Sequence, residues 1–303
     1  MAEQGFHEGE LAVQRRAGVH AQVARLGSSM LAIPNLSGGI GTFLADRDFA
    51  VLTARDGDRR LWASPLVASA GFLEASGRAL AIHTAPDSDD PLSGLGEGQP
   101  VGLLAIDFAT RRRVRVNGIL VGAGANGLRI SVDQAFGNCP KYIQQRHFDH
   151  VQHVTPVAGH VARADRLDAE HTALITRADT FFLGTIHPDR GADASHRGGP
   201  PGFVRVEDGQ LWWPDYPGNN MFNSFGNLAV DPTAAMLFVE FDRGATLQLS
   251  GTATVEWTAP NIPGDDGGVG RRVGFTVGSI VSRLGLGMHS DPPHPSPHNP
   301  PIT

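Results

Sequence analysis

The chain has 303 residues, 41% of them hydrophobic, which is long and apolar enough to build a substantial core in one large or two ordinary domains. Its formal net charge of −6 argues against a nucleic acid or an anionic membrane surface as the main partner. The single cysteine, Cys139, excludes an internal disulfide, and no apolar run near the N-terminus is typical of a signal peptide or a membrane helix. We therefore expect a soluble, cytoplasmic protein.

The first half of the chain predicts one helix followed by strands. An amphipathic helix is expected over residues 8–26, packed on the rest of the protein. Apolar and polar residues then alternate in ALAIH, LLAIDF and RVRVNG, which predicts strands with one face on a core. With 38 glycines and 21 prolines favouring tight turns, the composition and the alternation together predict a mainly β fold.

The motif FGNCPKYIQQR, residues 136–146, predicts a second helix that begins at Asn138 as N-cap with Pro140 just inside it. Lys141 would lie in the first turn, where the helix dipole disfavours a cation, so we interpret it as a candidate contact to an anion. Cys139 would have a lowered pKa at a helix N-terminus. The alternative is that this lone cysteine is a small buried apolar residue.

The next motif, HFDHVQH, places His147, His150 and His153 three residues apart, a spacing that fits one face of a helix. The thirteen histidines nevertheless show no paired ligand spacing with cysteine or carboxylates. We favour a solvated linker between two domains, and no metal site is predicted.

The second half of the chain repeats the first. The run that starts at Phe49 matches the run that starts at Thr180, and Gly71-Phe72 falls on Gly202-Phe203, 131 residues later. Further on, VGLLAIDFATRRRVRVNG matches AAMLFVEFDRGATLQLSG at a spacing of 133 residues. Two long copies predict two domains related by a pseudo-twofold axis. A duplication that serves stability alone is the simpler alternative.

The two copies differ after the central strand. The first copy reads HTAPDSDDPLSGL and carries three aspartates, whereas the second reads PDYPGNNMFNSFGN and carries Asn219, Asn220, Asn223 and Asn227. A turn followed by an amide-rich helix start makes a cradle for an anion, which aspartates would repel. An ordinary turn with an asparagine N-cap is the competing interpretation.

Together these motifs resemble the pyridoxamine 5′-phosphate oxidase-like, FMN-binding split-barrel family over residues 6–282, best in RRRVRVNG, FGNCPKYIQQR, SHRGGPPGFVRV and WWPDYPGNNMFNSFGN. Family members are usually homodimers of one barrel per chain. The resemblance therefore implies a β-barrel fold with peripheral helices, in which two tandem split barrels form a monomeric, intramolecular pseudo-dimer. We place the N-terminal helix and the first barrel in 1–160, the second barrel with its phosphate cradle in 161–288, and a disordered Pro/His-rich tail in 289–303. Further dimerisation is left open.

The resemblance also implies where FMN lies, in the groove between the barrels. In SHRGGPPGFVRV, glycines would let the backbone approach the cofactor, and a solvated surface hairpin is the alternative. The first barrel would contribute Arg113, and as a second choice Arg115, to the binding of the cofactor. We interpret Arg111 and Arg112 as a solvated patch. The remaining cofactor contacts implied are phosphate contacts from Ser195, Arg197, Asn219, Asn220 and Asn223, ring contacts from Phe203 and Val204, and a flavin-edge or anion contact from Lys141.

The function implied by the resemblance is an FMN-dependent oxidoreductase that transfers a hydride or electrons between the flavin and a small-molecule substrate, with a separate electron donor or acceptor. The flavin supplies the chemistry, so no catalytic residue is assigned. Two alternatives stay open: a flavin-binding or sensing protein without turnover, and a heme-handling protein on the same scaffold. FAD or a deazaflavin in place of FMN is also compatible with the sequence.

Overall fold

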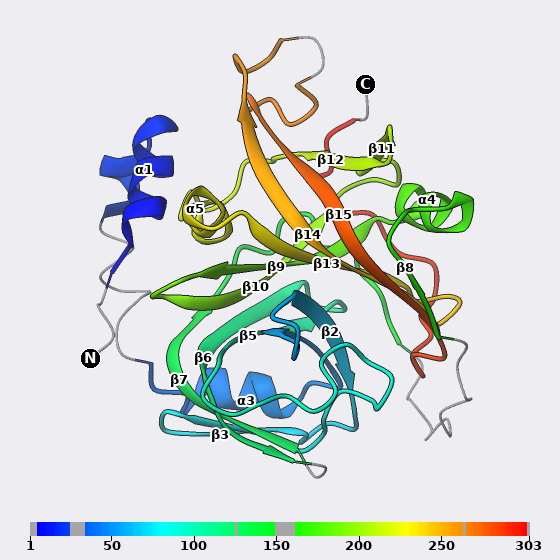
Figure 1. Ribbon diagram of the computed structural model, residues 1–303. Coiled ribbons are helices and arrows are strands. Elements are labelled where there is room, and N and C mark those ends of the chain that lie inside the picture. The colour runs from blue at the N-terminus through cyan, green and yellow to red at the C-terminus, as the bar shows by residue number, and fades with distance from the viewer. Residues whose placement is uncertain (1–4, 25–33, 125–126, 149–160, 263–264, 302–303) are drawn as a thin grey trace.

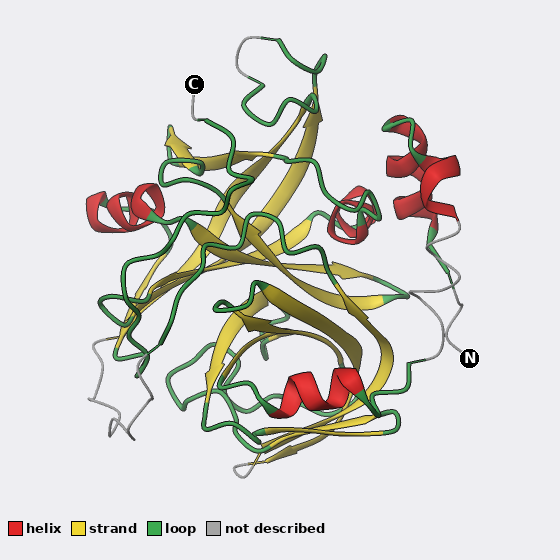
Figure 2. Ribbon diagram, turned by 180° about the vertical axis from the view of Figure 1, so that it is seen from behind, coloured by secondary structure: helices red, strands yellow, loops and turns green. Residues whose placement is uncertain are grey.

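The computed structural model describes residues 5–24, 34–124, 127–148, 161–262 and 265–301. These residues are mainly β and form two antiparallel sheets (Figures 1 and 2). The helices that accompany the sheets include α1 (Glu8–Arg16), α3 (Gly39–Ala45), α4 (Ala169–Arg177) and α5 (Asn223–Val230). No helix among the described residues is long and apolar enough to span a membrane.

The first sheet comes from the first half of the chain and has the order β2-β1-β5-β6-β7-β4-β3. It curls around α3 in the lower part of Figure 1, and its inner face forms a core with Phe43 and Leu44 of that helix. The strands are β1 (Phe49–Arg55), β2 (Leu61–Val67), β3 (Leu73–Ser76), β4 (Ala79–Ile82), β5 (Pro100–Asp107), β6 (Arg112–Gly124) and β7 (Gly127–Gly137).

The second sheet has the order β10-β9-β13-β14-β15-β12-β11, with β8 (Val161–Ala164) paired to the far end of β15. Its core contains α4 and α5 residues together with the apolar face of the strands. The strands are β9 (Thr180–His187), β10 (Gly191–Gly198), β11 (Arg205–Glu207), β12 (Gln210–Pro214), β13 (Thr233–Glu240), β14 (Ala245–Trp257) and β15 (Arg271–Leu284).

The two sheets share one strand order and one pairing register. Ala50 pairs with Ala105 in the first sheet, and the residues 131 and 133 positions later in the sequence, Phe181 and Phe238, pair in the second. The β6–β7 ladder slips between Asn117 and Gly118, and the β14–β15 ladder slips at the matching place, between Ser250 and Gly251. The internal match in the sequence thus corresponds to matching strand topology, whereas duplication of a split-barrel domain stays a prediction.

The sheets pack on each other in a reciprocal way. The edge strand β10 lies against β5 and β6, and its counterpart β2 lies against β13 and β14. A shared apolar core joins them, in which Phe49 of the first sheet contacts Phe182 of the second with ring centroids 5.6 Å apart. Gly102 allows the closest approach, because a Cβ there would lie 2.7 Å from the Cα of Asp193. This reciprocal packing leaves one cleft on each side of the shared core.

Both predicted helices differ in the structure. The N-terminal helix α1 ends at Arg16, since Gly18 adopts a left-handed φ of 72°, and helical backbone resumes only at 20–24. No helix begins at Asn138: a turn follows, with Tyr142 at φ 66°. Arg113 explains the second difference, because its Nη2 donates to the carbonyl oxygen of Cys139 at 2.8 Å and its own carbonyl accepts from the N–H of Asn138.

The C-terminal segment also differs from the disordered tail that its composition predicts. Residues 289–301 are described, and His294 forms a β-bridge with Gln145. Ser296 is buried, and its N–H donates to Oε1 of Gln144 at 2.8 Å. The polar backbone of the tail finds its partners in 142–148, which outweighs the compositional preference for disorder. His150 and His153 lie outside the described residues.

Candidate functional site

The candidate site is a cleft between the two sheets, where β10 and β12 of the second sheet face β6 and the segment after β7 of the first. It consists of two adjoining hollows that share part of their lining. The residues that line both hollows are Arg115, Arg197, Asp215, Tyr216, Gly218 and Asn219. Both halves of the chain therefore build one site.

Cationic side chains dominate this cleft. They come from β6, from the turn after β7, from β10 and from β15, and only one carboxylate, Asp215, is among the described lining residues. Such a surplus of positive charge in a partly enclosed cleft favours a bound anion. The five cations are Arg113, Arg115, Lys141, Arg197 and Arg271.

Arg113 reaches across from the first sheet to the second. Its Nη1 donates to Nδ1 of His196 at 2.8 Å and to the His196 carbonyl at 3.2 Å. Burial, followed by the neighbouring charges of Arg115 and Arg197, lowers the pKa of Arg113 to about 9. Since arginine always donates, Nδ1 of His196 accepts, and the proton of this neutral imidazole lies on Nε2. Burial and the arginines hold the pKa of His196 well below its usual range.

Two carboxylates offset part of the charge. Asp193 lies behind the cleft and accepts from Nη1 of Arg115 at 2.9 Å. Asp215 accepts from Nε of Arg271 at 2.8 Å, and Nη1 of Arg197 lies 4.0 Å from its other oxygen. Burial raises the pKa of Asp215 and lowers the pKa of Arg197. Among the ion pairs of the described residues, none joins Arg113 or Lys141 to a carboxylate.

The smaller hollow lies at the start of α5. Phe222 precedes the helix in a left-handed conformation, with φ 60°, and no side chain caps the helix. The first turn lines the hollow with Asn223, Ser224 and Phe225. The N–H groups at a helix start have no partner within the helix, and the helix dipole favours negative charge there. Anion-binding groups from α5 and from three arginines thus meet in one hollow.

Buried polar atoms without a hydrogen-bond partner concentrate around the larger hollow. Buried polar groups in native proteins are almost always paired, so these atoms call for partners that the described residues do not supply. Asn138 leaves both its amide nitrogen and its oxygen unpaired. The other such atoms on lining residues are Nε of Arg113, Arg115 and Arg197, Nε2 of His196 and Nε1 of Trp213.

Aromatic rings give the larger hollow its apolar surface. Phe203, Trp213, Tyr142 and Tyr216 line it, and the two tyrosine rings lie 5.0 Å apart between centroids. The adjacent glycines allow this packing, and their predicted role in a close approach of backbone to a cofactor stays a prediction. A Cβ at Gly199 would lie 2.6 Å from the Phe203 ring. A Cβ at Gly198 would lie 2.0 Å from the carbonyl oxygen of Tyr142.

The structure brings most of the sequence-predicted site residues together. The larger hollow has Arg113, Lys141, Arg197, Phe203 and Asn219 on its walls, and the smaller one has Arg197, Asn219, Asn220 and Asn223. This convergence comes from both halves of the chain, as the resemblance implies.

Ser195 and Val204 do not line the cleft. Ser195 is fully buried; its Oγ donates to the carbonyl of Leu183 and accepts from the hydroxyl of Ser224 at 3.1 Å. Val204 is fully buried in the core of the second sheet. The first turn of α5 covers the serine, and the sheet core takes the valine, so the expected direct contacts of these two residues with a cofactor are corrected.

His196, Asp215 and Arg271 are among the residues of the cleft that sequence reasoning missed. His196 stands between two nominated residues, and its place in SHRGG was the available signal. Asp215 and Arg271 are 56 positions apart and are joined by the pairing of β12 with β15. Their ion pair depends on tertiary contact, and no local pattern in the sequence reveals it.

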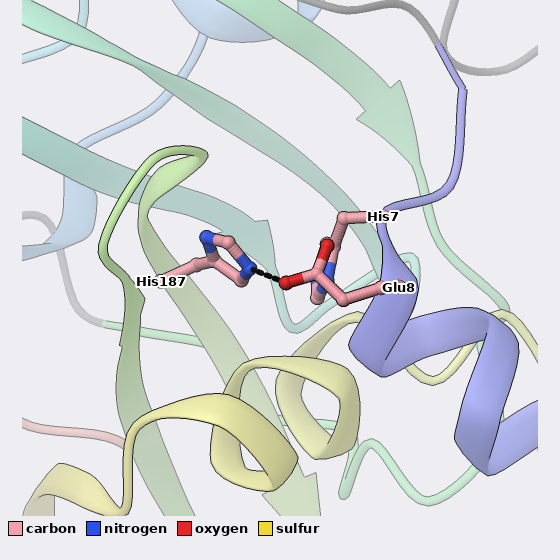
Figure 3. A group of neighbouring side chains, drawn as sticks. All are labelled: His7, Glu8 and His187. Atoms are coloured by element: carbon pink, nitrogen blue, oxygen red, sulfur yellow. Dashed lines mark hydrogen bonds and ion pairs between the residues drawn. The ribbon is translucent and has the colours of Figure 1, made fainter.

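A second group of potential ligands, His7, Glu8 and His187, lies where α1 meets β9 (Figure 3). Nδ1 of His7 accepts from the N–H of Gly9, and Nδ1 of His187 accepts from the N–H groups of Asp189 and Arg190. Each ring then carries its proton on Nε2, which donates to Asn227 and to Glu8, respectively, at 3.1 Å. A metal-binding histidine instead uses one nitrogen as ligand and donates from the other. This arrangement therefore suits a tether for α1 better than a metal centre.

Comparison with known proteins gives one family match. The pyridoxamine 5′-phosphate oxidase model matches residues 167–262, a span that contains Arg197 and Asn219 but none of the first sheet. No curated protein matches the chain.

Solved structures show distant likeness. HupZ of Group A Streptococcus has 15% identity and a TM-score of 0.29, over 38% of this chain and 91% of that chain. A putative pyridoxamine 5′-phosphate oxidase of Lactobacillus delbrueckii has 13% identity and a TM-score of 0.32, over 39% and 94%. The FAD binding protein of Mycobacterium smegmatis has 12% identity and a TM-score of 0.27, over 41% and 98%. Identities and TM-scores this low do not support any function for this chain.

Proposed function

We propose that this chain is an FMN-binding oxidoreductase of the pyridoxamine 5′-phosphate oxidase-like type, in which two tandem split barrels in one chain form a pseudo-dimer. The observation that carries the proposal is the convergence, from both sheets, of five cations and a cluster of unpaired buried polar atoms on one cleft. The family match over residues 167–262 supports it. The barrels are assigned to 1–160 and 161–288.

The phosphate of FMN is assigned to the smaller hollow. A phosphate monoester carries a charge of about −1.5 to −2 at neutral pH, and hydrogen bonds to it from arginine are charge-assisted. The contacting groups are the start of α5 with Asn219, Asn220 and Asn223, and the guanidinium groups of Arg115, Arg197 and Arg271. The residues present fit an organic phosphate, because the two carboxylates near these arginines leave a surplus of positive charge.

The flavin ring is assigned to the larger hollow, with its aromatic lining. The unpaired amide of Asn138 offers one donor and one acceptor, the complement of an imide edge such as that of a flavin. Arg113 and Lys141 add positive charge beside the ring. When bound, FMN supplies hydride or electron-pair transfer to or from a small-molecule substrate, and an electron donor or acceptor completes the cycle. The residues of the cleft bind the cofactor, orient it and reduce its contact with water.

The decisive experiment identifies the ligand that copurifies with the protein. We expect a yellow protein that releases FMN, identified by mass spectrometry, and a flavin that bleaches on addition of a reduced nicotinamide. Release of FAD or a deazaflavin would change the identity of the proposed cofactor but not the cleft to which it is assigned. A flavin that no electron donor reduces would favour a binding or sensing role without turnover. A Soret band, or absence of any flavin together with failure to bind added FMN, would overturn the proposal.

A further inference from the structure

Helix α1 packs on the back of the helix start that lines the smaller hollow. Gly9 and Gly226 let α1 and α5 touch, since a Cβ at Gly9 would lie 2.2 Å from the carbonyl oxygen of Gly226. Gln14 donates to the carbonyl of Met221 at 3.1 Å, just before α5 begins. The N-terminal helix thus holds the segment 221–226, which forms part of the anion-binding hollow.

An acid lies at this helix contact. Glu10 is 3% exposed, and its carboxylate accepts hydrogen bonds from the N–H of His7, at 2.8 Å, and from Nδ2 of Asn223. Both donors are neutral, so neither supplies a countercharge to the buried carboxylate. Burial, the largest effect, raises the pKa of Glu10 to about 7. The titratable and charged groups around it are His7, Glu8, His187, Arg190 and Asp193, and α5 itself carries no charged residue.

One side chain separates this acid from the hollow. Asn223 donates to Glu10 and also lines the smaller hollow. An anion in the hollow and an ionised Glu10 would therefore face each other across a single amide, in a partly buried region where charges interact more strongly than in water. Two negative charges at this separation repel, and a proton on Glu10 removes the repulsion.

We propose that Glu10 is a positioning residue that links anion binding in the cleft to the uptake of one proton. The inference rests on the proposed function and adds a property to it. An anion in the hollow raises the pKa of Glu10 further, so the complex holds this proton at pH values where the free protein has lost it. Affinity for a phosphorylated ligand then falls as pH rises above the pKa of the free protein. A ligand without phosphate lacks this dependence.

The test is a titration of the full-length protein, freed of ligand, with FMN and with riboflavin at pH 7.0 and 8.0. A phosphate monoester with a second pKa near 6 is largely a dianion at both values, and both lie below the pKa of about 9 for Arg113. We expect the Kd of FMN to rise about fourfold between them, given a bound-state pKa roughly one to two units higher, and the Kd of riboflavin to stay unchanged. Glu10→Gln should abolish the rise.

Glu8→Gln is the matched control, because Glu8 lies two positions away on α1, is 72% exposed and bonds to His187 instead. It should keep the fourfold rise. Proton uptake by the wild-type protein, measured by calorimetry at pH 7.5 in buffers of different ionisation enthalpy, is a second readout that needs no variant. FMN binding without proton uptake and with an unchanged slope in Glu10→Gln would overturn this inference alone. Failure of FMN to bind at either pH would overturn the proposed function and this inference with it.

Discussion

The two clefts between the sheets occupy matching places in the fold but differ in charge. The second cleft lies at the ends of β2 and β15 and is lined by Leu66, Thr246, Leu286, Asp87 and Arg283 among others. By strand register, Leu66 takes the place of Arg197, and Thr246 that of Arg113. Gly137 pairs with Val114 and Ser282 with Leu247, and counted from these matching positions Leu286 takes the place of Lys141. The described lining of the second cleft therefore carries fewer cations than that of the first.

An internal carboxylate, Asp90, lies beside Arg283 of the second cleft. Asp90 is buried and accepts from the hydroxyl of Ser64 at 2.6 Å, from the N–H of Leu92 at 2.8 Å and from Nε2 of Gln248 at 3.2 Å, with Arg283 3.6 Å away. Ser64 is the counterpart of Ser195. The polar groups around Asp90 are satisfied within the protein, whereas Arg115, the counterpart of Gln248, lines the hollow at α5. This is the difference expected between a structural and a ligand-binding cleft.

The largest expected effect comes from Arg115, compared with its counterpart Gln248. Arg115→Ala leaves Asp193 buried without its ion pair, and removing one partner of a buried pair costs about 3–5 kcal/mol of the free energy of unfolding. Gln248→Ala removes hydrogen bonds of a neutral amide, one of them to Asp90, and should cost roughly 1–3 kcal/mol. Urea denaturation of both variants measures the difference. Equal losses would mean that the charge asymmetry of the clefts has no energetic consequence.

Arg197 and Leu66 form the second matched pair. Arg197→Ala removes a charge-assisted contact to the proposed phosphate, worth about 1.5–3 kcal/mol, so FMN affinity should fall about ten- to a hundredfold. Riboflavin should lose much less. Leu66→Ala should lower stability without changing either affinity, and Arg112→Ala, at an exposed position, should do little to any of the three. A fall of equal size for FMN and riboflavin in Arg197→Ala would contradict the placement of the phosphate.

Asp90 gives the smallest expected effect, on the pH dependence of stability. Burial raises the pKa of Asp90 in the folded protein, so its contribution to stability is present at low pH and is lost as pH rises through that raised pKa. Asp90→Asn should flatten the decline. Chemical denaturation at pH 5 and pH 8 compares the two proteins. A variant with the same decline as the wild type would show that Asp90 is not the group that titrates.

The repeat and the strands could be predicted from the sequence because alternation and the Gly-Phe match are local signals that the sheets preserve. The pairing of Arg113 with the second half followed from the family resemblance and not from spacing. The prediction of a helix at Asn138 was wrong because Arg113, distant in the sequence, donates a hydrogen bond to the carbonyl oxygen of Cys139. The ion pair of Asp215 and Arg271 could not be predicted either, because the pairing of two strands distant in the sequence brings these residues together.

The contents of the two clefts test the account most directly. Purified protein freed of ligand is titrated with FMN at a protein concentration far above Kd, with flavin fluorescence as the signal. We expect saturation at one equivalent per chain, with FMN in the cleft of Arg113 and Arg197 and none in the cleft of Asp90. Two equivalents, or one equivalent that Arg197→Ala binds with an unchanged Kd, would contradict the assignment of one cleft to the cofactor and the other to structure.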